Sequence, residues 1–255
     1  MTEKRFIDSE YKELRKMARF KEVSLNFFNK KIKVPDSGSL IFLNRELFGQ
    51  EIYKFESSSK TPFIIDCGAN IGLSLIYFKK IYPNAKIIAF EPDKRIFNYL
   101  KYNINSFEFN NIELINKGLW KEETTLKFFS EGSDGGRIAI KDEMDNLIQI
   151  ETVTLSTYLR NNKVDFLKID IEGAETEVLL ECQNELKNVK NLFIEYHSFK
   201  NEKQSLSVIL NILEDNGFRY YIEHVGVKSD HPFCNILTSA GFDNQLNIFG
   251  YKNEK

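Results

Sequence analysis

One short stretch constrains this chain more than any other: an apolar run that leads into a glycine turn. Residues 63–72 read FIIDCGANIG, and apolar residues at helical spacing follow at Leu73, Ile76 and Ile81. This order predicts a strand, a tight turn and a helix, the arrangement in which a cofactor lies against a helix N-terminus. Because the two glycines of the turn lack a Cβ, the backbone can turn sharply there and lie against a ligand.

An acidic residue ends the next apolar run. Residues 87–90 read IIAF, and Glu91 follows them, nineteen positions after Gly72. An acid about 20 residues beyond a glycine turn is well placed to accept hydrogen bonds from the ribose hydroxyls of a nucleoside. By itself the turn could belong to an ordinary buried strand, and the spacing to Glu91 is what favours a nucleoside site.

From residue 61 onward, strand-like and helix-like segments alternate. Two further strands, expected at residues 125–129 and 152–155, would be antiparallel. Strands that alternate with helices predict an α/β fold with a mainly parallel sheet and helices on both faces. The main strands are predicted at residues 63–65, 86–90, 112–115, 164–170, 192–197, 218–222 and 246–251.

The carboxyl ends of these predicted strands carry polar residues and a glycine. Ligands of such sheets bind outside the carboxyl ends of the strands. The residues at these ends are therefore expected to face one shared site. They are Asp66, Glu91, Gly118, Asp170 and His197.

Two segments are expected to border that site. Residues 1–60 predict an appendage of helix, hairpin and second helix, joined by a polar linker to a main domain of residues 61–255. The appendage would form either a cap over the mouth of the site or a contact in a homo-oligomer. Residues 130–146 are polar and rich in glycine, which suits a mobile loop over the site or a plain surface loop.

The composition is that of an ordinary globular protein, with 255 residues, 42% of them hydrophobic, and a net charge of −2. This charge gives no reason to expect nucleic acid or an anionic membrane as a partner. No run approaches the roughly 18 apolar residues of a transmembrane segment. The three cysteines, Cys67, Cys182 and Cys234, follow no C-x-x-C pattern and no apolar signal core opens the chain, so a reduced, cytoplasmic protein is expected.

Four stretches together resemble the FkbM family of S-adenosylmethionine-dependent methyltransferases. They read IDCGANIG at 65–72, AFEP at 89–92, FLKIDIEGAE at 166–175 and IEYH at 194–197. The first two are typical of class I methyltransferases in general, and the third narrows the resemblance to FkbM-like proteins. The resemblance covers roughly residues 61–200 and implies a Rossmann-like class I fold with a mainly parallel, seven-stranded sheet.

The resemblance also implies a role for each matching residue. Glu91 would bind the ribose hydroxyls, and the stretch around Gly118 and Leu119 would bind adenine, with Phe90 and Leu119 flanking the ring. Family members methylate hydroxyl oxygens, so the expected acceptor is a small molecule or a glycan. We expect a sugar hydroxyl of a bacterial surface glycan or nucleotide-linked precursor, with a polyketide-type natural product as the alternative. The methionine part would be held by Asp66, Gly68, Asn70 and Gly72.

A hydroxyl acceptor must lose its proton during methyl transfer, which calls for a general base. His197 is the leading candidate because histidine titrates near neutrality, although it could instead be a structural histidine of the core. Asp170 is the second candidate, as a base, an orienting group or a helix cap. Asp170, Glu172 and His197 could also ligate Mg²⁺ or another divalent ion, but nothing in their spacing requires it.

Two other function classes stay open. An NAD-dependent oxidoreductase would need a glycine where Asn70 stands, because the pyrophosphate approaches the backbone closely at that position. The carboxylates of Asp66 and Glu91 would also repel a pyrophosphate, whereas they favour the sulfonium and ammonium groups of S-adenosylmethionine. A non-catalytic subunit that keeps the fold would retain cofactor binding without turnover.

Overall fold

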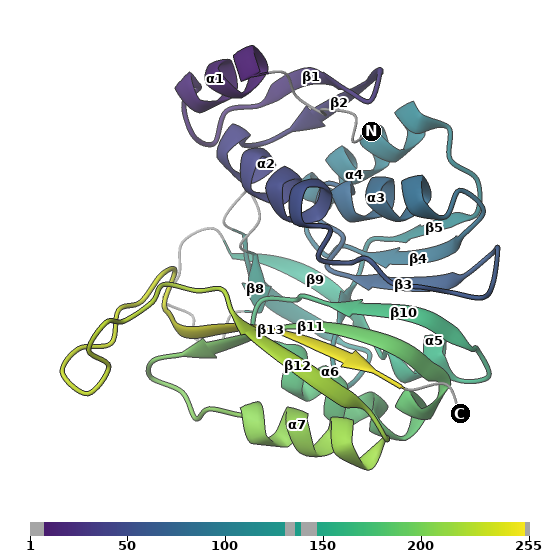
Figure 1. Ribbon diagram of the computed structural model, residues 1–255, viewed down its shortest axis with the longest axis vertical. Helices are drawn as coiled ribbons and strands as arrows, with labels where there is room; N and C mark the ends of the chain where they lie inside the picture. The colour runs from purple at the N-terminus through teal and green to yellow at the C-terminus, as the bar shows by residue number, and fades with distance from the viewer. Residues whose placement is uncertain (1–7, 131–135, 139–146, 253–255) are drawn as a thin grey trace.

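A seven-stranded sheet forms the centre of the protein in the computed structural model, which describes residues 8–130, 136–138 and 147–252 (Figure 1). Only β13 runs antiparallel to its neighbours in this sheet. The predicted mainly parallel, seven-stranded α/β fold is therefore confirmed. From edge to edge the strands are β12 (Arg219–His224), β13 (Phe242–Tyr251), β11 (Val189–Phe199), β10 (Val164–Ile169), β3 (Phe63–Cys67), β4 (Lys86–Phe90) and β5 (Ile112–Ile115).

The central strands are apolar because both of their faces are covered. Successive side chains of a strand point to opposite faces, so Ile64 packs into one hydrophobic cluster and Ile65 into another. Figure 1 shows α3 (Leu73–Ile81) and α4 (Lys94–Phe107) on one side of the sheet, with α6 (Glu175–Cys182) and α7 (Leu206–Asp215) on the other. Short helical segments α5 (Ser156–Leu159) and η2 (Gln183–Asn188) complete the second side.

The N-terminal segment forms the expected helix, hairpin and second helical region. Its hairpin and second helix bury Phe27, Ile32 and Leu40 in the hydrophobic cluster that also holds α3 and α4. The buried Asn103 of α4 donates to the carbonyls of Lys33 and Ile71, both at 2.9 Å, and so ties the hairpin to the glycine turn. The elements are α1 (Asp8–Lys16), β1 (Val23–Phe27), β2 (Lys30–Val34), α2 (Ser37–Asn44) and the π-helix η1 (Arg45–Gln50).

A second, smaller sheet contains the two additional strands that the sequence predicts. Its strands are β6 (Gly118–Leu119), β7 (Thr125–Phe129), β8 (Arg137–Ile138) and β9 (Leu147–Val153), and β7 pairs antiparallel to β9 as expected. The predicted bounds 152–155 are wrong, because β9 begins earlier to match the whole length of β7 and the chain turns into α5 at Ser156. Most of the predicted 130–146 loop lies outside the described residues.

Within the ranges given above, no helix combines the length and the apolarity that crossing a membrane requires.

Candidate active site

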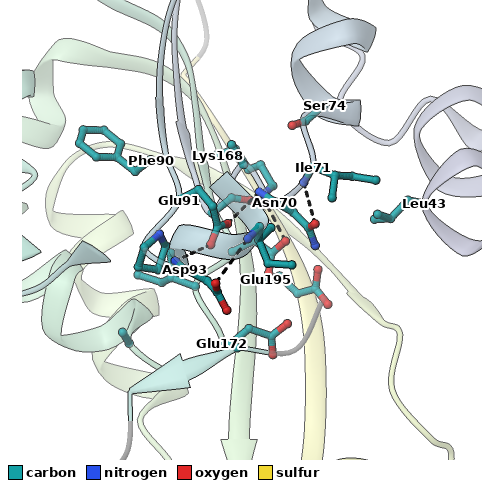
Figure 2. A pocket seen from close by; sticks show the side chains of 18 of the residues that line it. Leu43, Asn70, Ile71, Ser74, Phe90, Glu91, Asp93, Lys168, Glu172 and Glu195 are labelled. Carbon is teal, nitrogen blue, oxygen red and sulfur yellow. Dashed lines mark hydrogen bonds and ion pairs between the residues drawn. The ribbon is translucent and has the colours of Figure 1, made fainter. Parts of the chain in front are cut away.

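A cavity of about 270 Å³ opens where β3, β4 and β10 end (Figure 2). Three predicted residues, Asp66, Gly72 and His197, are not among the residues that line it. Asp66 lies behind the cavity wall with no exposed surface, and Gly72 is the N-cap residue of α3. The predicted residues that do line the cavity are Gly68, Asn70, Phe90, Glu91, Gly118, Leu119, Asp170 and Glu172.

The glycine turn forms one wall of the cavity and joins two strand ends. The backbone N–H of Gly68 donates to the carbonyl of Phe90 at 3.1 Å, and that of Ala69 donates to the same oxygen at 2.8 Å. Gly68 has a φ of +87°, and a Cβ at this position would lie 1.9 Å from the carbonyl oxygen of Asp170. Only glycine therefore allows the turn after β3 to approach the end of β10 this closely.

Gly72 offers a test of how tightly α4 packs against the turn. Its φ is +90°, and a Cβ would lie 2.7 Å from Leu100 Cδ1. Gly72→Ala is expected to lower the free energy of unfolding by about 2–3 kcal/mol, from left-handed strain plus crowding. Urea unfolding measures it.

The matched control is Gly217→Ala, because Gly217 has a φ of +75° with no atom near the added Cβ. In this variant the free energy of unfolding should fall only by the cost of the left-handed backbone, about 1–2 kcal/mol. Equal losses in the two variants would show that Leu100 moves aside without cost.

Glu91 is a buried acid of the cavity, with 7% of its surface exposed. Its Oε2 accepts from the backbone N–H of Asn70, and its Oε1 accepts from that of Asp93, both at 3.0 Å. Burial raises the pKa of Glu91 to about 8 despite these two hydrogen bonds. Figure 2 shows Glu91 beside Asn70 and Asp93. Both carboxylate oxygens are thus fixed in direction, as a ligand with two neighbouring hydroxyls requires.

Lys168 holds the floor of the cavity together. Its Nζ donates to the carbonyl of Gly68 at 2.7 Å and lies 3.3 Å from Asp66 Oδ1 and 3.2 Å from Asp170 Oδ2. Burial alone would lower the pKa of Lys168, but the carboxylates of Asp170 and Asp66 raise it well above its ordinary value. The lysine is therefore a buried cation that joins the end of β3 to the end of β10.

His197 lies within the sheet and not at the end of a strand as predicted. β11 continues to Phe199 because β13 pairs with it there, with His197 opposite Gln245. The imidazole has no exposed surface; its Nδ1 lies 3.0 Å from Glu175 Oε1, and its Nε2 lies 3.5 Å from Glu172 Oε2. Burial alone would lower the pKa of His197, but Glu175 and the other carboxylates around it raise it well above its ordinary value. These surroundings favour the imidazolium form.

The three residues suggested as metal ligands do come together. Asp170, Glu172 and His197 each offer a ligand atom, and these atoms lie within 4.8 Å of one another. Two carboxylates and an imidazole suit a divalent ion, and the Glu175 contact at the other ring nitrogen resembles the orienting partner of a metal-bound histidine. The donor set fits such an ion, and a metal at this place remains a prediction.

Several residues that line the cavity were not predicted from the sequence. Lys168 had a readable signal, because a lysine inside a strand that is otherwise mostly apolar must find a buried partner. Glu195 lies between buried residues of β11 and belongs to the IEYH stretch of the family resemblance, but no role in the site was predicted for it. The N-terminal segment also supplies cavity residues that no motif marks, namely Phe42, Leu43, Glu46 and Leu47.

Comparison with known proteins agrees with this geometry. Methyltransferase sdnD of Sordaria araneosa is 28% identical over 69% of this chain and 81% of its own length. Methyltransferase 1 of Beauveria bassiana is 25% identical over 71% of this chain and 82% of its own length. The crystal structure of methyltransferase FkbM from Methylobacillus flagellatus matches with a TM-score of 0.50 and 18% identity, over 79% of this chain but only 46% of that one.

The sheet order, the glycine turn after β3 and the acid after β4 define the class as a Rossmann-like methyltransferase. The sequence profile of the methyltransferase FkbM domain matches residues 66–220, which is more than half of the chain. The protein therefore belongs to the FkbM methyltransferase family and is a methyltransferase, as its sequence motifs indicated.

Proposed function

We propose that this methyltransferase uses S-adenosylmethionine to methylate a hydroxyl oxygen of a sugar. The observation that carries the proposal is the buried carboxylate of Glu91, fixed beside the glycine turn at the carboxyl edge of the sheet. A carboxylate in this place accepts hydrogen bonds from both ribose hydroxyls of a nucleoside cofactor. The sulfonium and ammonium groups of S-adenosylmethionine also suit a cavity with several acids.

The remaining cavity residues divide between the two halves of the cofactor. Phe90 and Leu119, both buried, would flank the adenine ring, with Gly118 leaving room beside it. Gly68 and Asn70 would hold the methionine part through the backbone of the turn. Asp66 supports this part indirectly, because it accepts from Ser74 Oγ at 2.5 Å and pairs with Lys168 behind the turn.

The acceptor would lie at the acidic side of the cavity. Figure 2 shows Glu172 and Glu195 on the side of Glu91 away from Phe90, and Asp170 lines the same cavity. Carboxylates accept hydrogen bonds from sugar hydroxyls and repel phosphates, so a neutral or amino sugar is favoured over a nucleic acid. A hydroxyl of a polyketide-type natural product is the second candidate, favoured by the apolar side chains of Phe42, Leu43 and Leu47 that line the cavity.

Methyl transfer mainly requires that the acceptor oxygen, the methyl carbon and the sulfur lie in line. Asp170 would orient the acceptor hydroxyl, since the ion pair with Lys168 holds its carboxylate in place. The carboxylates around His197 favour a positioning role for this residue over that of the base, because an imidazolium has no lone pair to accept a proton.

The cofactor assignment is tested by thermal unfolding of the whole chain with S-adenosylhomocysteine or NAD. A ligand at 100 times its dissociation constant stabilises a protein by about 2.7 kcal/mol, which is roughly 5–10 °C for a domain of this size. We expect this shift with S-adenosylhomocysteine and none with NAD. A shift with NAD and none with S-adenosylhomocysteine would instead support an NAD-dependent oxidoreductase. Binding without methyl transfer to any simple pyranoside or polyketide alcohol would favour the non-catalytic subunit.

A further inference from the structure

The N-terminal segment contributes a wall of the cavity that is distinct from the cofactor motifs. Phe42 and Leu43 of α2 and Glu46 and Leu47 of η1 all line the cavity. Residues three and four apart share one side of a helix, so this segment presents a continuous face to the site. Figure 2 shows Leu43 entering opposite Phe90, on the side away from the proposed adenine position. The segment therefore borders the acceptor half.

Glu46 is the acidic residue of this face. It lies in the π-helix η1, where the wider turn brings the backbone N–H of Glu51, five residues further on, to donate to the Glu46 carbonyl. Single π-turns are rare and frequently occur at functional sites. Across the described part of the chain, the Glu46 carboxyl has no hydrogen bond or ion pair, although it is half-buried. A carboxyl that lines a cavity without a partner is available to a ligand.

The charges that face Glu46 come from several elements. Glu195 on β11, Asp170 after β10 and Glu223 on β12 are the acids near it, and Arg45 is the nearby cation. Burial, together with the neighbouring carboxylates of Glu195 and Asp170, raises the pKa of Glu46 to about 8, and Arg45 opposes this shift. Asp170 differs in that Lys168 lies 3.2 Å from it. The Asp170 carboxylate is thus already held in an ion pair with a buried lysine.

We infer that Glu46 is the general base that accepts the proton of the acceptor hydroxyl, an inference that rests on the proposed function. The acceptor oxygen forms a bond to the methyl carbon while the carbon–sulfur bond breaks, and the electron pair of that bond stays on sulfur as a neutral thioether. The hydroxyl proton passes to the ionised Glu46 carboxylate. The N-terminal segment therefore completes the active site as well as covering it.

The first test needs no acceptor. In the whole protein labelled with ¹³C at the glutamate carboxyl carbons, we expect the resonances of Glu46 and Glu91 to titrate near pH 8. Glu46→Gln should remove one of them, and S-adenosylhomocysteine should shift only the other. Glu51→Gln is the matched control, because Glu51 follows the same π-helix but pairs with Lys54 outside the cavity. An ordinary titration near pH 4–5 for Glu46 would overturn the inference.

The second test follows transfer of a labelled methyl group to methyl α-D-pyranosides at saturating S-adenosylmethionine. Because only the ionised carboxylate accepts a proton, the wild-type rate should rise with pH through about 8. Glu46→Gln should lower this rate by about 10²–10⁴-fold and flatten the rise, with unchanged affinity for S-adenosylmethionine. A variant that retains the rate and its pH profile would refute the role of Glu46. Failure of wild type to bind S-adenosylmethionine would instead refute the proposed function.

Discussion

Replacing Lys168 with methionine is expected to be among the most destabilising single changes in this protein. The side chain of Lys168 is 4% exposed, and its partners Asp66 and Asp170 are 0% and 24% exposed. Removing the cation leaves two neighbouring carboxylates without their counter-charge in a site that excludes most water. Loss of one partner of a buried ion pair costs about 3–5 kcal/mol, and methionine, which nearly matches the lysine stem in length, adds little cavity cost.

Urea unfolding at pH 7 measures this loss, with Lys163→Met as the matched control. Lys163 is exposed one residue before β10 begins, so its replacement should change stability by less than about 0.5 kcal/mol. Combining Lys168→Met with Asp66→Asn and Asp170→Asn should recover part of the loss, because the amides remove the unpaired charges. A loss below about 1 kcal/mol in Lys168→Met would mean that water reaches this cluster freely.

The main sheet could be predicted because its signals are local. Each central strand is a short apolar run covered on both faces. The glycine turn after β3 could be predicted from two glycines that follow Asp66 by two and six residues. The position of Glu91 followed from the same local order, since a parallel strand that is four to six residues long delivers the next residue to the same edge. The bounds of β9 could not be predicted, because they depend on its pairing with β7.

The parts of the site that escaped prediction depend on contacts between distant segments. Nothing near Glu46 in the sequence indicates that it lines the same cavity as Glu195, since the two come together only when the N-terminal segment packs against α3 and α4. The surroundings of His197 likewise come from β13 and from α6. Sequence periodicity identifies the strand that carries a residue, but the charges around its side chain are set by tertiary packing.

Glu91→Ala is expected to weaken binding of S-adenosylmethionine by about 10²- to 10⁴-fold, measured by calorimetric titration. The proposed site loses two hydrogen bonds from the ribose hydroxyls to a carboxylate, each worth about 1.5–3 kcal/mol, and tenfold in affinity is about 1.4 kcal/mol. The backbone N–H groups of Asn70 and Asp93 also lose their acceptor, so the turn becomes less well fixed.

The control is Glu113→Ala, which replaces an exposed acid on the neighbouring strand β5 and should change the affinity by less than about twofold.

The pH dependence of the affinity separates a ribose contact from a merely structural role of Glu91. Since burial raises the pKa of Glu91 to about 8 in the free protein, the carboxylate is largely protonated below that pH and ionises above it. Affinity in wild type should therefore rise between about pH 6.5 and 9, because the ionised form accepts both hydroxyls. The alanine variant should lose this rise together with the affinity; a rise that persists without Glu91 would assign the ribose contact to another acid, of which Asp93 is the nearest along the chain.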